Sequence, residues 1–319
     1  MKKTPISLII DDPAPRVFVF YEHSFDKQTK DGRPLVDNVP NDFLFRFCDA
    51  IERYGIKGKY SVVPIPGGRG RIDESIPGFE QSEIQEWIDT VKGRVGKYFD
   101  FCPEVLTHAG YIDLATGKMM DEWENKWSFR QTHKELTPYI SLALEILKNV
   151  GINATGVTSP WDFGVKVEDE YAKAIALAMD KVHGKKESWY FCRDLFNQPN
   201  AKPWIAYKDE EHTVVSIPAT INDKFWQAMD TTDTSEEYVR SIADYYISED
   251  GKSGRIIEVL DSNGWPILLS HWQSLFSNGA GTGLRILELI AQRVEEHLSD
   301  RVEWTAYGDM MKRTLEENK

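Results

Sequence analysis

The sequence predicts an α/β fold, a single (β/α) barrel, regular or distorted, of about seven or eight mainly parallel strands. Three observations predict it. Short apolar runs that stop at polar, Gly or Pro residues alternate with amphipathic stretches, which is the pattern of βα units. About eight such runs can be counted, and no internal repeat or Pro/Ser-rich linker interrupts them. A length of 319 residues suits one α/β barrel, so we expect residues 1–319 to form one domain.

Local signals predict the elements in order along the chain. The run at residues 7–10 predicts a buried first strand. Asn41 is the expected N-cap of the next helix, Phe43 and Phe47 lie on its apolar face, and Gly55 ends it. The other strands are expected at residues 59–63, 104–107, 155–158, 188–192, 214–218, 267–270 and 302–305. The other helices are expected from residue 82, at residues 138–149 and at residues 284–297.

The charge balance limits the partners of the chain. Lys and Arg total 38 against 51 Asp and Glu, a net charge of −13, and no basic block could follow a phosphate backbone. We therefore expect no nucleic-acid partner. No segment approaches the run of ~18 apolar residues that spans a bilayer, so we expect no membrane insertion either.

The start of the chain does not resemble a secretion signal. The apolar stretch at residues 6–10 is interrupted by Ser7 and stops at two aspartates, which is too short for a signal h-region. We expect a cytoplasmic location, although a secreted or periplasmic chain whose signal had been removed would look the same. Cys48, Cys102 and Cys192 are far apart and predict neither a disulfide framework nor a cysteine metal site.

Four polar residues stand where predicted strands end. Asp11 and Asp12 directly follow the first strand, and His108 and His271 each follow a later one. A barrel brings strand ends together whatever their distance in sequence. Two adjacent carboxylates repel each other unless a cation or a shared proton relieves them. We therefore expect the active site around these four residues.

In this order and placement, the residues resemble the motifs of polysaccharide deacetylases of the NodB-homology type, and of the wider glycoside hydrolase/deacetylase barrels. The family's first motif, an apolar strand ending in Asp-Asp, is similar to residues 10–12, and its later histidine is similar to residues 107–108. Its Leu-x-His motif matches residues 269–271, and residues 302–305 resemble its closing strand. Residues 159–164 are loosely similar to the cluster that lines the family's groove. In motif order the resemblance covers the chain from the first strand to about residue 312.

The resemblance implies a hydrolase of carbohydrate metabolism, a metal-dependent deacetylase that cleaves a carbon–nitrogen bond other than a peptide. Asp11 would be the general base, and Asp12 and His108 would hold a divalent metal, most simply Zn²⁺. His271 would donate a proton to the leaving amine, so that Asp11 and His271 form an acid/base pair.

One departure from the family concerns the metal site. The family has a second histidine four residues after the first, where this chain has Ile112. We expect Asp113 to be the replacement ligand, because Ala109 and Gly110 give the loop freedom to move a carboxylate toward the metal. His133 is an alternative ligand. A further alternative is that the metal site is altered or lost.

Aromatic residues indicate the substrate class. Trp161 and Trp272 adjoin the candidate motifs and could stack on sugar rings. Asp162, in the cluster that resembles the groove lining, is grouped with them as substrate-binding. We expect a small-molecule or oligosaccharide substrate. The sequence carries no signal for an oligomeric state.

Two other functions are compatible with the same residues. A metal-independent glycoside hydrolase would use two separated carboxylates, such as Asp12 with Asp162 or Glu104. A non-catalytic carbohydrate-binding barrel with a degenerate metal site is the other alternative. Tightly bound metal would argue against both.

Overall fold

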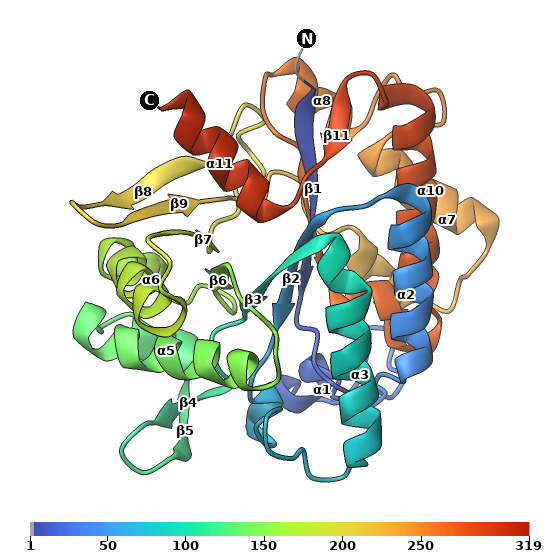
Figure 1. Cartoon of the computed structure of the whole chain (residues 1–319). Helices are drawn as coiled ribbons and strands as arrows, with labels where there is room; N and C mark the ends of the chain where they lie inside the picture. The colour runs from blue at the N-terminus through green and yellow to red at the C-terminus, as the bar shows by residue number, and fades with distance from the viewer. Residues whose placement is uncertain (1–2, 319) are drawn as a thin grey trace.

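The computed structural model describes residues 3–318, which form a mixed α/β fold around a parallel central sheet (Figure 1). In spatial order its strands are β10 (Ile267–His271), β1 (Thr4–Asp11), β2 (Gly58–Val62) and β3 (Phe99–Pro103), with β11 (Val302–Trp304) paired to the start of β1. Every pair is parallel, so the carboxyl ends of the strands share one edge. The register sets Asp11 beside His271 at that edge.

A second sheet lies beside the first. Its strands are β6 (Gly156–Thr158), β7 (Glu187–Phe191), β9 (Thr213–Ser216) and β8 (Trp204–Lys208), of which β8 is antiparallel to β9. Isolated parallel bridges join the two sheets, from Phe101 to Ala154 and from Glu104 to Thr158 on one side, and from Ile221 to Leu268 on the other. The two larger sheets are therefore connected by isolated bridges on both sides, an arrangement consistent with a distorted barrel.

Helices cover the outer faces of the sheets. α2, α3 and α10 lie along the central sheet, and α5 and α6 pack together beside β6 and β7 (Figure 1). The helices are α1 (Val19–His23), α2 (Asn41–Tyr54), α3 (Gln81–Gly93), α4 (Glu124–Ser128), α5 (His133–Asn149), α6 (Glu168–His183), α7 (Glu236–Tyr246), α8 (Arg255–Asp261), α9 (Trp272–Phe276), α10 (Thr282–Leu298) and α11 (Tyr307–Glu317). None of these described helices combines the length and the apolar character needed to cross a membrane.

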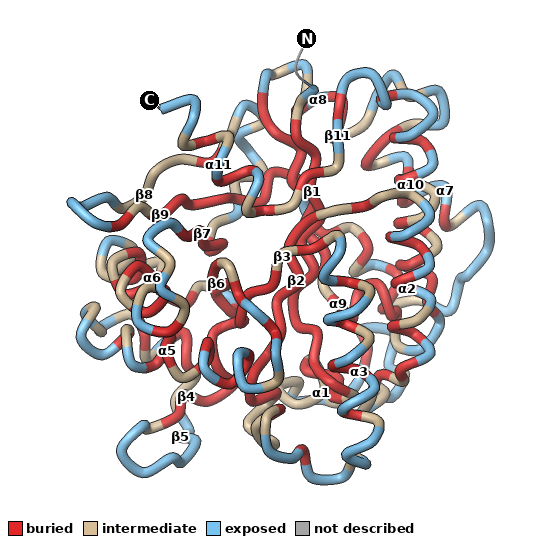
Figure 2. Tube along the Cα trace, in the orientation of Figure 1, coloured by how far each residue is buried: buried red, intermediate tan, exposed pale blue. Residues whose placement is uncertain are grey.

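The strands β1, β2, β3 and β10 of the central sheet are almost entirely buried, as the red central segments of Figure 2 show. One face of each strand packs against the helices, where Leu8 and Ile10 join the larger apolar core. The alternate residue Ile9 joins a smaller core with Phe191 and Leu269 between the two sheets. Because side chains alternate along a strand, Asp11 follows Ile9 onto this inner face.

Several predicted boundaries differ from the structure. The strand expected at residues 104–107 lies earlier, at β3, because parallel pairing with β2 uses Phe99–Pro103. α5 begins at His133, five residues before its expected start, because Thr132 and Glu135 form a capping box there. The hairpin of β4 (Gly110–Asp113) and β5 (Lys118–Trp123) was not predicted, and neither was β8.

Candidate active site

A cavity of about 370 Å³ opens at the carboxyl ends of β1 and β10. It brings together the four residues that the sequence placed at strand ends: Asp11, Asp12, His108 and His271. The other lining residues come from the ends of strands, from the loops that follow strands and from short helices: Phe20, His23, Glu104, Ser159, Trp161, Phe191, Cys192, Asp194, Trp226, Leu269 and Gln273. Loops after strands are where α/β barrels build their sites.

Three side chains converge at the wall of this cavity. His108 Nε2 lies 2.9 Å from Asp12 Oδ1 and 3.4 Å from Glu104 Oε1. All three residues are buried, and one ligand atom from each lies within 4.8 Å of the others. The Oδ2 atom of Asp12 accepts a hydrogen bond from Gln273 Nε2, so His108 Nε2 approaches the other carboxylate oxygen, Oδ1. Two buried carboxylates and an imidazole whose ligand atoms lie this close together form a donor set that suits a divalent cation.

Glu104 stands four residues before His108 in the sequence, whereas the expected ligand, Asp113, stands after it. Its carboxylate also accepts a hydrogen bond from the backbone N–H of Asp12, at 2.6 Å. Burial, followed by the charges of Asp12 and Asp11, raises the pKa of Glu104 well above its usual range. From the sequence, a second metal ligand was expected after His108. The structure instead places a candidate ligand, Glu104, four residues before it.

Asp113 is not brought to the site, contrary to expectation. It ends β4, and its carboxylate accepts hydrogen bonds from the backbone N–H groups of Ala115 and Thr116, at 2.8 and 3.2 Å. The side chain therefore stabilises the turn of the hairpin. His133, the alternative ligand, begins α5 and pairs with Glu170 at 2.6 Å.

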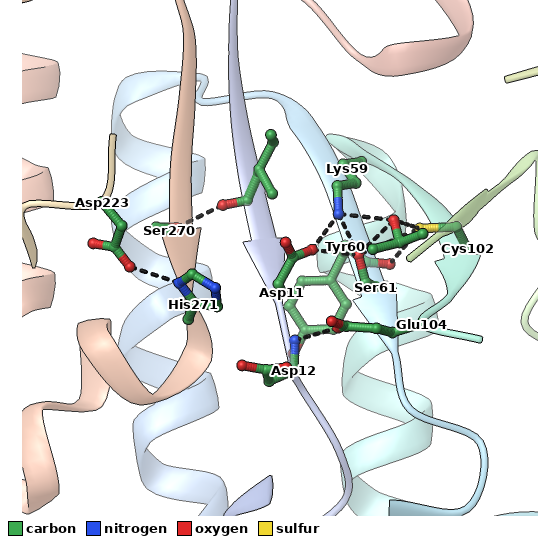
Figure 3. Close-up of polar contacts among 12 residues, drawn as sticks. Asp11, Asp12, Lys59, Tyr60, Ser61, Cys102, Glu104, Asp223, Ser270 and His271 are labelled. Carbon is green, nitrogen blue, oxygen red and sulfur yellow. Dashed lines mark hydrogen bonds and ion pairs between the residues drawn. The ribbon is translucent and has the colours of Figure 1, made fainter. Parts of the chain in front are cut away.

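Asp11 is held by a buried cation (Figure 3). Lys59 is fully buried, and its ammonium pairs with Asp11 Oδ1 and donates to Ser61 Oγ and Thr158 Oγ1, at 2.6 and 2.8 Å. Ser61 also donates to Asp11 Oδ1, at 2.9 Å. Both contacts end on Oδ1, which leaves Oδ2 as the oxygen that could accept a proton.

His271 is oriented by Asp223, which lies in the segment between β9 and α7 (Figure 3). The Nδ1 atom of His271 lies 2.7 Å from Asp223 Oδ2, so its Nε2 is the ring atom left for another partner. Burial alone would lower the pKa of His271. The hydrogen bond and charge of Asp223, with smaller effects of Asp12 and Asp11, outweigh burial and raise this pKa to about 9.

Trp161 lies at the mouth of the cavity, as the sequence suggested. Its ring meets His108 edge-on at 4.2 Å between centroids and also contacts His23 and Trp123, and 42% of the residue is exposed. Asp12, His108 and Trp161 all have positive φ angles, of 70°, 53° and 50°. Such strained backbone in residues other than glycine is concentrated at functional sites.

Trp272 and Asp162 do not line the cavity. Trp272 is 1% exposed and packs edge-on against Phe43, Phe47 and Tyr60 in the apolar core. Its neighbour His271 ends β10 and lines the cavity, whereas Trp272 begins α9 and packs into the apolar core. Asp162 accepts a hydrogen bond from Asn125 at 2.5 Å, outside the cavity lining.

Replacing Trp272 with alanine should lower the free energy of unfolding by ~3–5 kcal/mol, because it empties a large buried volume. The matched change Trp161→Ala should cost less than about 1 kcal/mol and should instead weaken substrate binding. Chemical denaturation of both variants, with ligand titration, measures the two effects. Equal losses of stability would contradict this division.

Known proteins resemble this chain in structure. No model of a protein family matches the sequence, and no curated protein sequence matches it. The structure is similar to that of a Mycobacterium smegmatis protein described as a polysaccharide deacetylase, with a TM-score of 0.52 and 12% identity over 86% of this chain and 78% of the other.

Two further structures match more loosely. One is a Parabacteroides distasonis protein described as a glycoside hydrolase/deacetylase, with a TM-score of 0.49 and 9% identity over 97% of this chain and 71% of the other. The other is a Bacillus subtilis peptidoglycan deacetylase, with a TM-score of 0.41 and 11% identity over 99% of this chain and 94% of the other. The likeness to the M. smegmatis structure shows that the two chains share a fold, in agreement with the fold that the sequence motifs implied.

Proposed function

We propose that this chain is a metal-dependent hydrolase that removes an acyl group, such as acetyl, from a carbohydrate or a related amide or ester. One observation carries the proposal. The cluster of Asp12, Glu104 and His108 lines the same cavity as Asp11 and His271. Asp11 is ion-paired with Lys59, and His271 is ion-paired with Asp223. A cation site beside a potential base and a potential acid is the minimum set for metal-assisted hydrolysis.

Asp12, Glu104 and His108 would hold the ion, which we expect to be Zn²⁺ or another divalent first-row metal. When bound, such an ion supplies Lewis acidity that polarises the carbonyl of the scissile bond and acidifies water. Asp11 and His271 line the same cavity, and three protein ligands suit a catalytic metal site that keeps one position open. Glu104 takes the role that the sequence analysis gave to Asp113.

The proton transfers fall to the two residues that the register of β1 and β10 sets side by side. Asp11 would take the proton of the attacking water through Oδ2, because Oδ1 is engaged by Lys59 and Ser61. His271 would donate from Nε2 to the leaving nitrogen or oxygen, because Nδ1 is engaged by Asp223. A histidine with a pKa near 9 is protonated at neutral pH, as a general acid must be.

Aromatic rings support a carbohydrate as the substrate. From His108, a series of edge-on contacts runs through Trp161 and Trp123 to Phe25, which is 88% exposed. Rings can cover the apolar faces of sugars while neighbouring polar groups meet the hydroxyls. A sugar chain longer than the cavity would extend over this rim.

The glycoside hydrolase alternative fits the geometry less well. Paired glycosidase carboxylates stand about 5 Å or more apart on either side of the scissile bond. Asp12 and Glu104 instead approach one imidazole nitrogen, and a hydrogen bond links them through the backbone of Asp12. Asp162, the other suggested partner, lies outside the cavity lining.

Metal analysis of protein purified without chelator tests the proposal. The parent should retain a divalent ion, and His108→Ala and Glu104→Ala should each lose it, because each removes a ligand. Asp113→Ala should keep the ion and is the matched control. Metal content by mass spectrometry decides the matter, and a parent that holds no metal under zinc-supplemented conditions would contradict the proposal.

The activity should also depend on pH through His271. Because its pKa is raised, the acid form persists through neutral pH and activity should fall as pH rises through about 9. Asp223→Asn removes the carboxylate whose charge and hydrogen bond raise this pKa, so the alkaline limb of the pH profile of kcat/KM should move to lower pH.

The raised pKa of His271 also affects the stability of the fold. The His271–Asp223 pair should contribute fully to the free energy of unfolding below about pH 6.5, and this contribution should be lost as pH rises through about 9. Rate profiles and melting temperatures across this range measure both effects, and an unmoved limb in Asp223→Asn would refute the pairing.

A further inference from the structure

Glu124 is a buried carboxylate close to the site that does not line the cavity. It is the first residue of α4, directly after β5, and it is 0% exposed. Its Oε1 accepts a hydrogen bond from the backbone N–H of His108 at 2.5 Å. Its Oε2 accepts from the backbone N–H of Thr107 at 3.2 Å and from the hydroxyl of Tyr139 at 3.0 Å. One carboxylate thus binds two consecutive N–H groups at the histidine that would ligate the metal.

His108 needs such support because of its own conformation. Its φ of 53° lies in the left-handed region, which a residue with a side chain adopts at a cost. Its Nδ1 has no hydrogen-bond partner among residues 3–318, and the ring instead stacks on His23 at 4.9 Å between centroids. Metal-binding histidines usually donate their second ring nitrogen to a partner that fixes the ring. Here the described contacts orient the ring through its backbone and its aromatic neighbours.

We propose that Glu124 is a positioning residue that sets His108 for metal binding. The inference rests on the proposed metal site and extends it to a residue that touches neither the cavity nor the other ligands. Glu124 holds the left-handed turn at Thr107 and His108, and it links this turn to the hairpin of β4 and β5 and, through Tyr139, to α5.

The carboxylate is specifically suited to this position. Both of its oxygens accept hydrogen bonds, whereas a glutamine amide offers one accepting oxygen and a donating NH₂ group. In Glu124→Gln, one of the two backbone N–H groups would face another donor in a buried place, so the turn should shift and His108 with it. Aspartate keeps both acceptors on a shorter stem and should restore part of the function.

The test is a zinc titration of metal-free protein against a competing chelator, for the parent, Glu124→Gln and Glu124→Asp. We expect Glu124→Gln to weaken zinc binding about 10–100-fold, the usual effect of losing a group that orients a ligand. Glu124→Asp should lie between it and the parent. Glu135→Gln is the matched control, because Glu135 also accepts a backbone N–H, at the start of α5, and it should bind zinc as the parent does.

Melting curves of the metal-free variants accompany the titration. A folded Glu124→Gln that binds zinc as tightly as the parent would overturn the inference. If Glu124→Gln does not fold, Glu124→Asp decides, and parental zinc affinity in that variant would overturn it equally. A parent that binds no zinc would overturn the proposed function and this inference together, which distinguishes that failure from loss of the Glu124 role alone.

Discussion

Replacing His271 with alanine is expected to lower kcat for hydrolysis of an acetylated sugar by about 10²–10⁴-fold, the usual contribution of a general acid. Asp11→Asn should cause a loss of the same order, because an amide cannot take the proton of the attacking water. KM should change little in both variants, since neither change removes the aromatic rim. Initial rates over a range of substrate concentrations measure kcat and KM separately.

The controls separate chemistry from structure. Metal content should be unchanged in His271→Ala, because His271 is not among the three proposed ligands. His297→Ala is the matched control, since His297 lies outside the cavity and bonds the carbonyl of Glu249 at 2.9 Å. If both His271→Ala and Asp11→Asn stay within a few-fold of the parent, the acid/base assignment fails.

The residues at strand ends were predictable from the sequence, and the reason is geometric. Parallel strands bring their carboxyl ends to one edge, so Asp11, Asp12 and His271 could be grouped once their strands were recognised. Lys59 had a weaker signal. Lys59 and Ser61 alternate with Tyr60 and Val62 in β2, a period-two pattern that indicates a polar inner face in a strand that is otherwise buried.

The other parts of the site depend on loop conformation, which the sequence does not determine by periodicity. Glu104 lies one residue beyond β3, and the path of the chain from there to the left-handed His108 decides which carboxylate meets the imidazole. Asp223 and His23 lie in segments that no motif marks. Trp272 was misplaced because its proximity to His271 in sequence was taken as proximity to the cavity, although α9 begins at Trp272 and carries its side chain into the core.

Replacing Lys59 with methionine is expected to lower the free energy of unfolding by about 3–5 kcal/mol, because it leaves Asp11 as an uncompensated buried charge. Lys59 is fully buried and Asp11 is 3% exposed. The ammonium is surrounded by Asp11, Ser61 and Thr158, and it lies 4.6 Å from the centre of the Phe191 ring. Methionine fills much of the same volume, so the loss reports the charge more than a cavity.

The double variant Lys59→Met/Asp11→Asn tests this interpretation directly. Removing both charges should recover a large part of the stability lost in Lys59→Met, because a buried ion pair replaced as a whole costs little. Lys186→Met is the surface control. Its ammonium pairs with Asp180 and Glu211 at 2.8 and 2.9 Å while half exposed, and such pairs contribute about 0–1 kcal/mol. Denaturant unfolding of the parent, Lys59→Met, Asp11→Asn and the double variant gives the coupling energy between Lys59 and Asp11. A double variant no more stable than Lys59→Met would mean that the lysine stabilises the fold through Ser61 and Thr158 rather than through the carboxylate.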